Sequence, residues 1–238
     1  MCGRFTQTKD KDEIAELFGL PPLPEYEPRA WSPTEAPARF NIAPTQDVLV
    51  IRTATSGRTG EWMRWGLVPP SAKDLKGGAR MINARSETIF DKPVFKTAAK
   101  YRRCLIPTDG FFEWRREGKT KQPFYIQTNG ETFAMAGLYE RWKAPSGDTV
   151  KTVTILTCAP NALVETLHDR MPVILPKETW SQWLDPEVQD RGALEPLLCA
   201  FDGDAMKMTA VQTEVNSVKN DTEACVTPLV AKQTGFGF

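Results

Sequence analysis

The sequence has a single histidine, no Cys-x-x-Cys pair and no long apolar stretch, and each absence excludes a class of function. A zinc centre normally needs several Cys or His ligands at short spacing, so no metal or other cofactor is expected. No segment approaches the roughly 20 apolar residues of a membrane-spanning helix. The N-terminus lacks the apolar core of a secretion signal, so we expect a cytoplasmic protein that makes no membrane contact.

Neither sign of charge predominates. The chain carries 30 Lys and Arg against 30 Asp and Glu, so its formal net charge is zero. A surface coated with nucleic acid is usually strongly basic, so any nucleic-acid contact must come from a local basic patch. Basic residues gather near Arg4, at 96–103 and at 115–121. Such runs are usually solvated surface, and the third suits the tip of a hairpin.

Cysteines are few and widely spaced. The chain contains Cys2, Cys104, Cys158, Cys199 and Cys225. An odd number at wide spacing, in a reducing cytoplasm, argues against a disulfide framework. Four of them are best interpreted as small buried apolar residues, and Cys2 stands apart.

The 238 residues suit one α+β domain over 1–238, with tail 231–238 outside its core. We expect twisted, mostly antiparallel sheets in a barrel-like core with peripheral helices. Asp10, Glu13 and Gly19 predict caps for a helix over 9–18. Further helices are expected at 94–101, 161–168, 176–184 and 188–199. Strands are expected at 47–53 and 61–67, which flank the turn SGRTG, and at 102–107, 109–114, 121–127, 132–142 and 149–158.

Cys2 is the first candidate for chemistry. Met1 is removed from a chain whose second residue is small, and cysteine qualifies. The mature chain then begins with an amine of pKa about 7.7–8.0 beside a thiol of pKa about 8.5, so both have reactive forms at pH 7. Such an aminothiol condenses with an aldehyde to an imine, which the thiolate closes to a thiazolidine. The alternative is that Cys2 is simply the second residue of a strand.

Two further groups can transfer protons. His168, the one histidine, lies in LHDRMP at the expected end of a helix and suits a loop site for acid–base catalysis, although a lone histidine is more often structural. Glu113, in DGFFEW, either lies on a solvated strand face or points into a pocket that raises its pKa. Strand alternation predicts that Phe112 and Trp114 face away from Glu113.

A polar strand is expected within MINARSET. Asn83, Arg85 and Glu87 alternate there, so we expect them to share one strand face. An amide, a guanidinium and a carboxylate together indicate a polar site, and a solvated face is the common alternative. Arg4, two residues from Cys2, is a candidate phosphate ligand.

Ten short motifs, in order, resemble the SOS-response-associated peptidase (SRAP) family, whose members shield abasic sites. They are MCGRF, FNIAPTQ, RWGLVP, MINARSET, RRCLIPTDGFFEW, KQPFYI, AGLYERW, ILTCAPNA, HDRMPVIL and VNSVKND. No single motif is decisive, but together they span almost the whole chain.

The resemblance implies a single α+β domain with a positive cleft for single-stranded DNA. It implies that Cys2, once N-terminal, captures the aldehyde of an abasic site, with Asn83 on the sugar. Glu113 would assist proton transfer and self-cleavage ahead of the cysteine, and His168 would serve Schiff-base formation and reversal. Phosphates would contact Arg4, Arg85, Arg170 and Thr157. A monomer that joins the nucleoid when bound to DNA is expected, with lyase activity where ring closure fails.

Three alternatives remain open: a thiol peptidase that acts on other proteins through Cys2 and His168, a non-covalent module for single-stranded DNA, and a structural α+β domain with no active site. The chain also departs from the family pattern. In WGLVPPSAKD, Ser71 stands where many members carry a tryptophan that wedges against bases. Because stacking contributes about 1–3 kcal/mol per base, weaker DNA affinity is expected.

Overall fold

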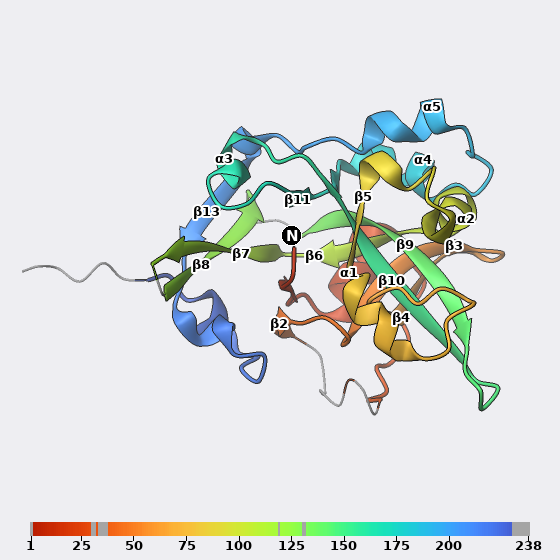
Figure 1. Cartoon of the computed structure of the whole chain (residues 1–238), viewed down its shortest axis with the longest axis horizontal. Helices are drawn as coiled ribbons and strands as arrows, with labels where there is room; N and C mark the ends of the chain where they lie inside the picture. Colours follow the sequence, from red (N-terminus) through yellow and green to blue (C-terminus); the bar gives the residue numbers. More distant parts are fainter. Residues whose placement is uncertain (1, 30–31, 33–37, 119, 130–131, 230–238) are drawn as a thin grey trace, which may run out of the picture.

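The computed structural model describes residues 2–29, 32, 38–118, 120–129 and 132–229. Within them, five strands pair in a closed ring (Figure 1). The ring consists of β3 (Asp47–Ala54), β4 (Gly57–Trp65), β6 (Arg103–Thr108), β9 (Phe133–Lys143) and β10 (Thr149–Cys158). β10 runs parallel to β4, and the other neighbours are antiparallel. The expected barrel-like α+β core is confirmed as a closed barrel, which leaves these strands no free edge in the ring.

Near-continuous burial marks the barrel strands. β6 is buried along its whole length, and β9 is buried from its start through Glu140. Strands whose two faces are both buried need cover on the outside of the barrel as well as packing inside it. Part of the cover comes from helix α4 (Trp180–Leu184), where the indole of Trp183 donates a 2.9 Å hydrogen bond to the carbonyl of Cys104.

Three short strands extend the barrel wall, and a second sheet stands beside it. β5 (Asn83–Arg85) and β11 (Met171–Pro172) pair with β10, and β12 (Ile174–Leu175) pairs with β9. The second sheet has the order β13–β8–β7–β1–β2 and antiparallel pairing. Its strands are β1 (Phe5–Gln7), β2 (Arg39–Ile42), β7 (Gly110–Glu117), β8 (Thr120–Thr128) and β13 (Met206–Ala210).

The predicted hairpin over 47–67 is confirmed, but its turn is shorter than expected. Ala54 pairs with Gly57, so only two residues separate β3 from β4. Gly57, the first residue after these two, has a φ of 109°, which lies in the left-handed region that glycine adopts without strain. Most of the SGRTG segment therefore belongs to β4.

The helices are short and peripheral. The first predicted helix is confirmed as α1 (Lys11–Phe18), with the Asp10–Glu13 capping box and the left-handed Gly19 at its end. Figure 1 shows α2, α4 and α5 together on one side of the barrel. The other helices are α2 (Pro93–Tyr101), α3 (Ala162–Glu165), α4 (Trp180–Leu184) and α5 (Arg191–Leu194). The 3-10 turns are η1 (Leu75–Arg80), η2 (Ser86–Thr88), η3 (Lys177–Thr179), η4 (Glu195–Leu197), η5 (Gly203–Ala205), η6 (Thr213–Asn216) and η7 (Glu223–Val226).

One expected surface charge is structural instead. Arg103, in the second basic run, is only 4% exposed. Its guanidinium donates to the carbonyls of Trp183 and Lys100, both at 2.6 Å, and to three further carbonyls. Its neighbour Arg102 forms a 2.5 Å ion pair with Glu140. The run at 96–103 is therefore not a free basic patch, because tertiary packing engages its two arginines.

Several smaller expectations are also settled. Cys104, Cys158 and Cys225 are buried as expected, but Cys199 is exposed. None of the helices in the described ranges is long and apolar enough to cross a membrane. The predicted tail 231–238 and the residue Met1 lie outside the described residues.

Candidate functional site

Cys2 lies where the two sheets meet. It precedes β1, and its side chain is fully buried. The Nδ2 of Asn83 donates a 2.8 Å hydrogen bond to the carbonyl oxygen of Cys2. Because β5 carries Asn83 and pairs with β10, this bond ties the start of the second sheet to the barrel wall. Figure 1 shows the first described residues in the middle of the molecule, between β7 and β5.

The thiol of Cys2 is less acidic than the sequence predicts. Burial raises its pKa far above the ordinary range for a thiol, and the nearby carboxylate of Glu113 raises the pKa further. Burial disfavours the thiolate here, because a buried anion loses its hydration. A reaction through this sulfur needs a base close by to take the proton.

Glu113 is such a group. It lies on β7, opposite Phe124 of β8, and is only 4% exposed. Burial raises its pKa to about 7, so its carboxyl can hold or release a proton near neutral pH. Phe112 and Trp114 pack together in a separate apolar cluster on the other face of β7, as strand alternation predicted. The sequence left the direction of Glu113 open, and the structure buries it within electrostatic range of Cys2.

His168 lies on the loop between α3 and β11, about one-third exposed. Its Nδ1 is 3.0 Å from the backbone nitrogen of Arg170 and 2.8 Å from Oδ1 of Asp169. The two contacts need different protonation states, since only a neutral Nδ1 accepts from the amide and only a protonated one donates to Asp169. Burial lowers the pKa of His168, which favours the neutral form at pH 7, with its proton on Nε2.

Arg170 is held from two sides. Its Nη1 and Nη2 donate to the two carboxylate oxygens of Glu87 at 2.6 and 2.8 Å, and Nη2 donates to the carbonyl of Thr157 at 2.5 Å. The side chain of Arg170 is only 11% exposed, and Thr157 is 1% exposed. The expectation that Glu87 shares a strand face with Asn83 is wrong, because β5 ends at Arg85 and Glu87 lies in η2.

A groove opens beside Cys2 on the side of the second sheet. It is lined by Gly3, Arg4, Pro44, Trp114, Lys121 and Asn216. The guanidinium of Arg4 stands 6.0 Å from the centre of the Trp114 ring. Its Nη1 donates 2.8 Å hydrogen bonds to Oδ1 of Asn41 and to the carbonyl of Val215, which fix its direction.

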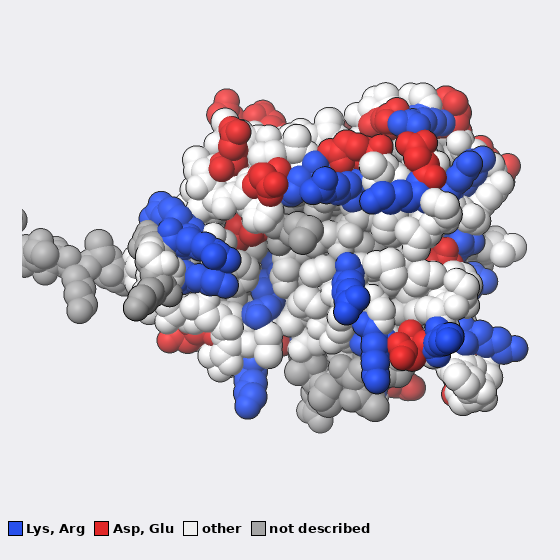
Figure 2. Space-filling model, in the orientation of Figure 1, with Lys and Arg blue, Asp and Glu red and all other residues white. Residues whose placement is uncertain are grey.

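Basic side chains flank this groove. Figure 2 shows Lys and Arg gathered at the β7–β8 end of the molecule and again near β5. Lys121 lies on β8, and Arg85, at the end of β5, is exposed. Ser71, where a tryptophan was expected, is exposed in the turn that follows β4. The aromatic ring that lines the groove is instead that of Trp114.

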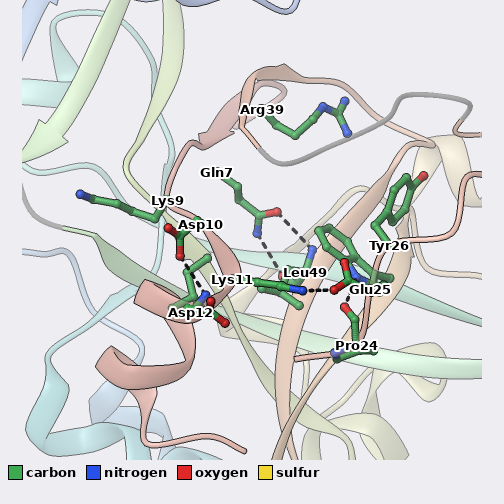
Figure 3. A pocket seen from close by; sticks show the side chains of 12 residues that line it. Gln7, Lys9, Asp10, Lys11, Asp12, Pro24, Glu25, Tyr26, Arg39 and Leu49 are labelled. Carbon is green, nitrogen blue, oxygen red and sulfur yellow. Dashed lines mark hydrogen bonds and ion pairs between the residues drawn. The ribbon is translucent and has the colours of Figure 1, made fainter. Parts of the chain in front are cut away.

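A second cavity lies at the other end of β1 and has a different character. It is bordered by Gln7, Asp10, Lys11, Glu25, Tyr26, Arg39 and Trp62, among others (Figure 3). Several of its charged side chains already have partners: Asp10 caps α1, Lys11 pairs with Glu25, and Arg39 pairs with Asp221. Cys2 does not line this cavity.

The structure thus assembles most of the predicted residues from four separate motifs. Cys2 contacts Asn83 and lies within electrostatic range of Glu113. The pKa of Glu113 is also raised by the charge of Asp169, the neighbour of His168 in the sequence. Sequence reasoning missed Trp114, Lys121 and Asn216 as groove residues. The only sequence signal for Trp114 was its place beside Glu113.

The chain combines a closed barrel with a second sheet, and a buried cysteine lies beside a carboxyl group where the barrel and the sheet meet. These features define a class of single-domain α+β proteins. The family model described as SOS response associated peptidase (SRAP) matches residues 1–218. The chain belongs to this family, as its motifs predicted.

Relatives cover nearly the whole chain. The abasic site processing protein YoqW of Bacillus subtilis (strain 168) is 44% identical over 228 residues, which are 93% of this chain and 97% of YoqW. The abasic site processing protein YedK of Escherichia coli (strain K12) is 28% identical over 96% of this chain and 100% of YedK. An X-ray structure of a Bacteroides thetaiotaomicron protein superimposes with a TM-score of 0.82 at 25% identity, over 96% of this chain and 100% of that one.

Proposed function

We propose that this SRAP protein processes abasic sites in single-stranded DNA by forming a covalent bond through Cys2. The observation that carries the proposal is the arrangement around Cys2: a buried thiol, its carbonyl held by Asn83, beside a carboxyl group whose pKa is about 7. The names of the relatives support the same substrate, because YoqW and YedK are both described as abasic site processing proteins.

The proposed reaction starts once Met1 has been removed. The free amine of Cys2 attacks the aldehyde carbon of the ring-opened sugar, and the carbinolamine loses water to give an imine. The sulfur then bonds to the imine carbon while its proton passes to the imine nitrogen, which closes a thiazolidine. Glu113 would carry protons for the thiol, and its electrostatic effect on the pKa of Cys2 supports this role.

Asn83 and His168 have complementary roles in this scheme. Asn83 uses its Nδ2 to hold the backbone of Cys2, while its buried Oδ1 accepts no hydrogen bond from the described residues. An unsatisfied buried acceptor is unfavourable, so a sugar hydroxyl that donates to it would be bound. Neutral His168 presents a proton on Nε2 for the carbinolamine and imine steps and for their reversal.

The DNA strand is proposed to follow the groove beside Cys2. Phosphates would lie against Arg4, Arg85 and Arg170, and a base would stack on Trp114. Thr157 is almost fully buried, so we assign it the support of Arg170 through its carbonyl rather than a direct phosphate contact. The protein would act as a monomer and reach the nucleoid when bound to DNA.

Two related activities follow from the same site. An imine that fails to close permits β-elimination at the sugar, which is a lyase reaction. Glu113 would also assist cleavage of the bond that precedes Cys2, which would be a hydrolase reaction of the chain on itself. Peptidase action on other proteins is less favoured, because Arg4, Lys121 and Trp114 line the groove beside Cys2, and cations and an aromatic ring suit nucleic acid.

The test is a denaturing gel. The protein, with loss of Met1 verified by mass spectrometry, is mixed with a single-stranded oligonucleotide that carries one abasic site. A shifted band that survives SDS and disappears with Cys2→Ala supports covalent capture, and Cys104→Ala serves as a matched control. A band that survives Cys2→Ala overturns the proposal. Complexes with intact and abasic DNA that SDS dissociates equally would favour a non-covalent binding module.

A further inference from the structure

The ion pair between Glu87 and Arg170 stands out among the contacts around the site. It is bidentate, with both carboxylate oxygens engaged at 2.6 and 2.8 Å. The side chain of Glu87 is half exposed, whereas that of Arg170 is nearly buried. Bidentate arginine–carboxylate pairs fix orientation more strictly than a single contact does. Glu87 therefore restricts the guanidinium of Arg170 to one plane.

The pair joins the two halves of the site. Glu87 lies in η2, directly after β5, whose Asn83 holds the carbonyl of Cys2. Arg170 lies two residues after His168, and its backbone nitrogen donates to Nδ1 of that ring. A continuous series of contacts thus runs from Cys2 through β5 and the ion pair to His168.

We propose that Glu87 is a positioning residue for His168. It acts through Arg170, by holding the His168 loop at a set distance from the strand that holds Cys2. The inference rests on the proposed function, because it needs a reaction at Cys2 in which His168 takes part. Neither the family resemblance nor the arrangement of the groove assigned any role to Glu87.

The size of the effect follows from what Arg170 loses without Glu87. The guanidinium keeps one contact, to the carbonyl of Thr157, and its Nε is already buried without a partner among the described residues. A guanidinium held on one side can rotate, and the backbone amide that orients His168 moves with it. Misplacement of a catalytic group by about 1 Å can cost up to 100-fold in rate, so we expect about tenfold.

The experiment is a double-mutant cycle on the DNA crosslink. The variants are Glu87→Gln, His168→Gln and the two combined, and the rates of crosslink formation and reversal are measured on an abasic oligonucleotide. We expect Glu87→Gln to slow reversal about tenfold in the unsubstituted background and by less than about twofold in the His168→Gln background. Glu87→Asp, which keeps the carboxylate, should recover part of the loss.

Two controls distinguish the positioning of His168 from a general effect of removing a carboxylate and from a change in DNA affinity. Glu61→Gln breaks an ion pair with Arg52 and Lys151 on the barrel, away from Cys2, and should leave both rates unchanged. The affinity of Glu87→Gln for intact single-stranded DNA, measured by fluorescence anisotropy, should stay within about threefold. Melting temperatures identify any variant that is unfolded. If Glu87→Gln is unfolded, the rates of crosslink formation and reversal of Glu87→Asp provide the test instead.

Each other outcome overturns the inference. Equal losses in both backgrounds would mean that Glu87 acts independently of His168. Unchanged rates would mean that Arg170 orients the loop without it. A large change in affinity for intact DNA with unchanged rates would mean that Glu87 competes with a phosphate for Arg170. If the unsubstituted protein forms no crosslink, the proposed function itself fails, and the inference falls with it.

Discussion

Replacement of Glu113 by Gln should stabilise the fold at alkaline pH. Burial raises the pKa of this carboxyl from 4.5 to about 7, so the folded protein binds its proton more tightly than the unfolded chain does. The stability that Glu113 contributes is complete below about pH 4.5 and is lost as pH rises through 7. Because one pH unit corresponds to about 1.4 kcal/mol, the ionised carboxylate destabilises the fold by about 3 kcal/mol.

Most of this difference lies within an accessible range of pH. Between pH 5 and pH 8 the stability of Glu113→Gln relative to the unsubstituted protein should rise by about 2.5 kcal/mol. The measurement is urea denaturation of both proteins at several pH values in this range. Glutamine has nearly the same shape and does not ionise, so the variant removes the titration without opening a cavity.

Glu61→Gln provides a control in which the pKa shift of the carboxyl, and the effect of the substitution on stability, have the opposite sign. Burial acts to raise the pKa of Glu61, but its hydrogen bonds to Lys151 and Arg52 outweigh burial and lower it. Glu61 therefore stays ionised in both states above pH 5, and its substitution should cost stability almost independently of pH. A difference for Glu113→Gln that does not change between pH 5 and pH 8 would refute the claim that Glu113 is desolvated.

Two further predictions address the fold and the groove. Arg103→Met should lower the free energy of unfolding, measured by urea denaturation, by about 3 kcal/mol, because it leaves a set of buried carbonyls unpaired. Arg58→Met is the control and should lower the free energy of unfolding far less, since the Arg58 side chain bonds only to Ser181 among the described residues. Lys121→Gln should reduce the slope of log affinity for single-stranded DNA against log salt by about 0.7, and Lys143→Gln should leave it unchanged. An unaltered slope for Lys121→Gln would place the strand elsewhere.

Local elements could be read from the sequence because their determinants lie within a few residues. The α1 helix is the clearest case, since its capping residues Asp10, Glu13 and Gly19 all lie within or directly beside the helix in the sequence. The strands from β6 to β10 were also predicted, because turn residues and β-branched or aromatic runs mark them. The end of β5 was misjudged, since it depends on where pairing with β10 stops, at Arg85.

Long-range packing determined the features that the local sequence did not predict. Arg103 and Arg115 belong to similar basic runs, yet only Arg103 is buried, and it donates to carbonyls contributed by α2, α4 and the residues that follow α4. No local pattern distinguishes them, because the acceptors of Arg103 near α4 lie about 80 residues along the chain.

The sequence by itself determined the family, the candidate residues and the aminothiol chemistry open to Cys2, because these depend on residue type and order. The tertiary structure alone decided that Asn83 holds Cys2, that Glu113 faces it and that Glu87 reaches the His168 loop through Arg170. It also decided the acidities, since a pKa depends on burial and on the charges nearby. The contacts and the pKa values both depend on pairing between distant segments, of β1 with β7 and of β5 with β10.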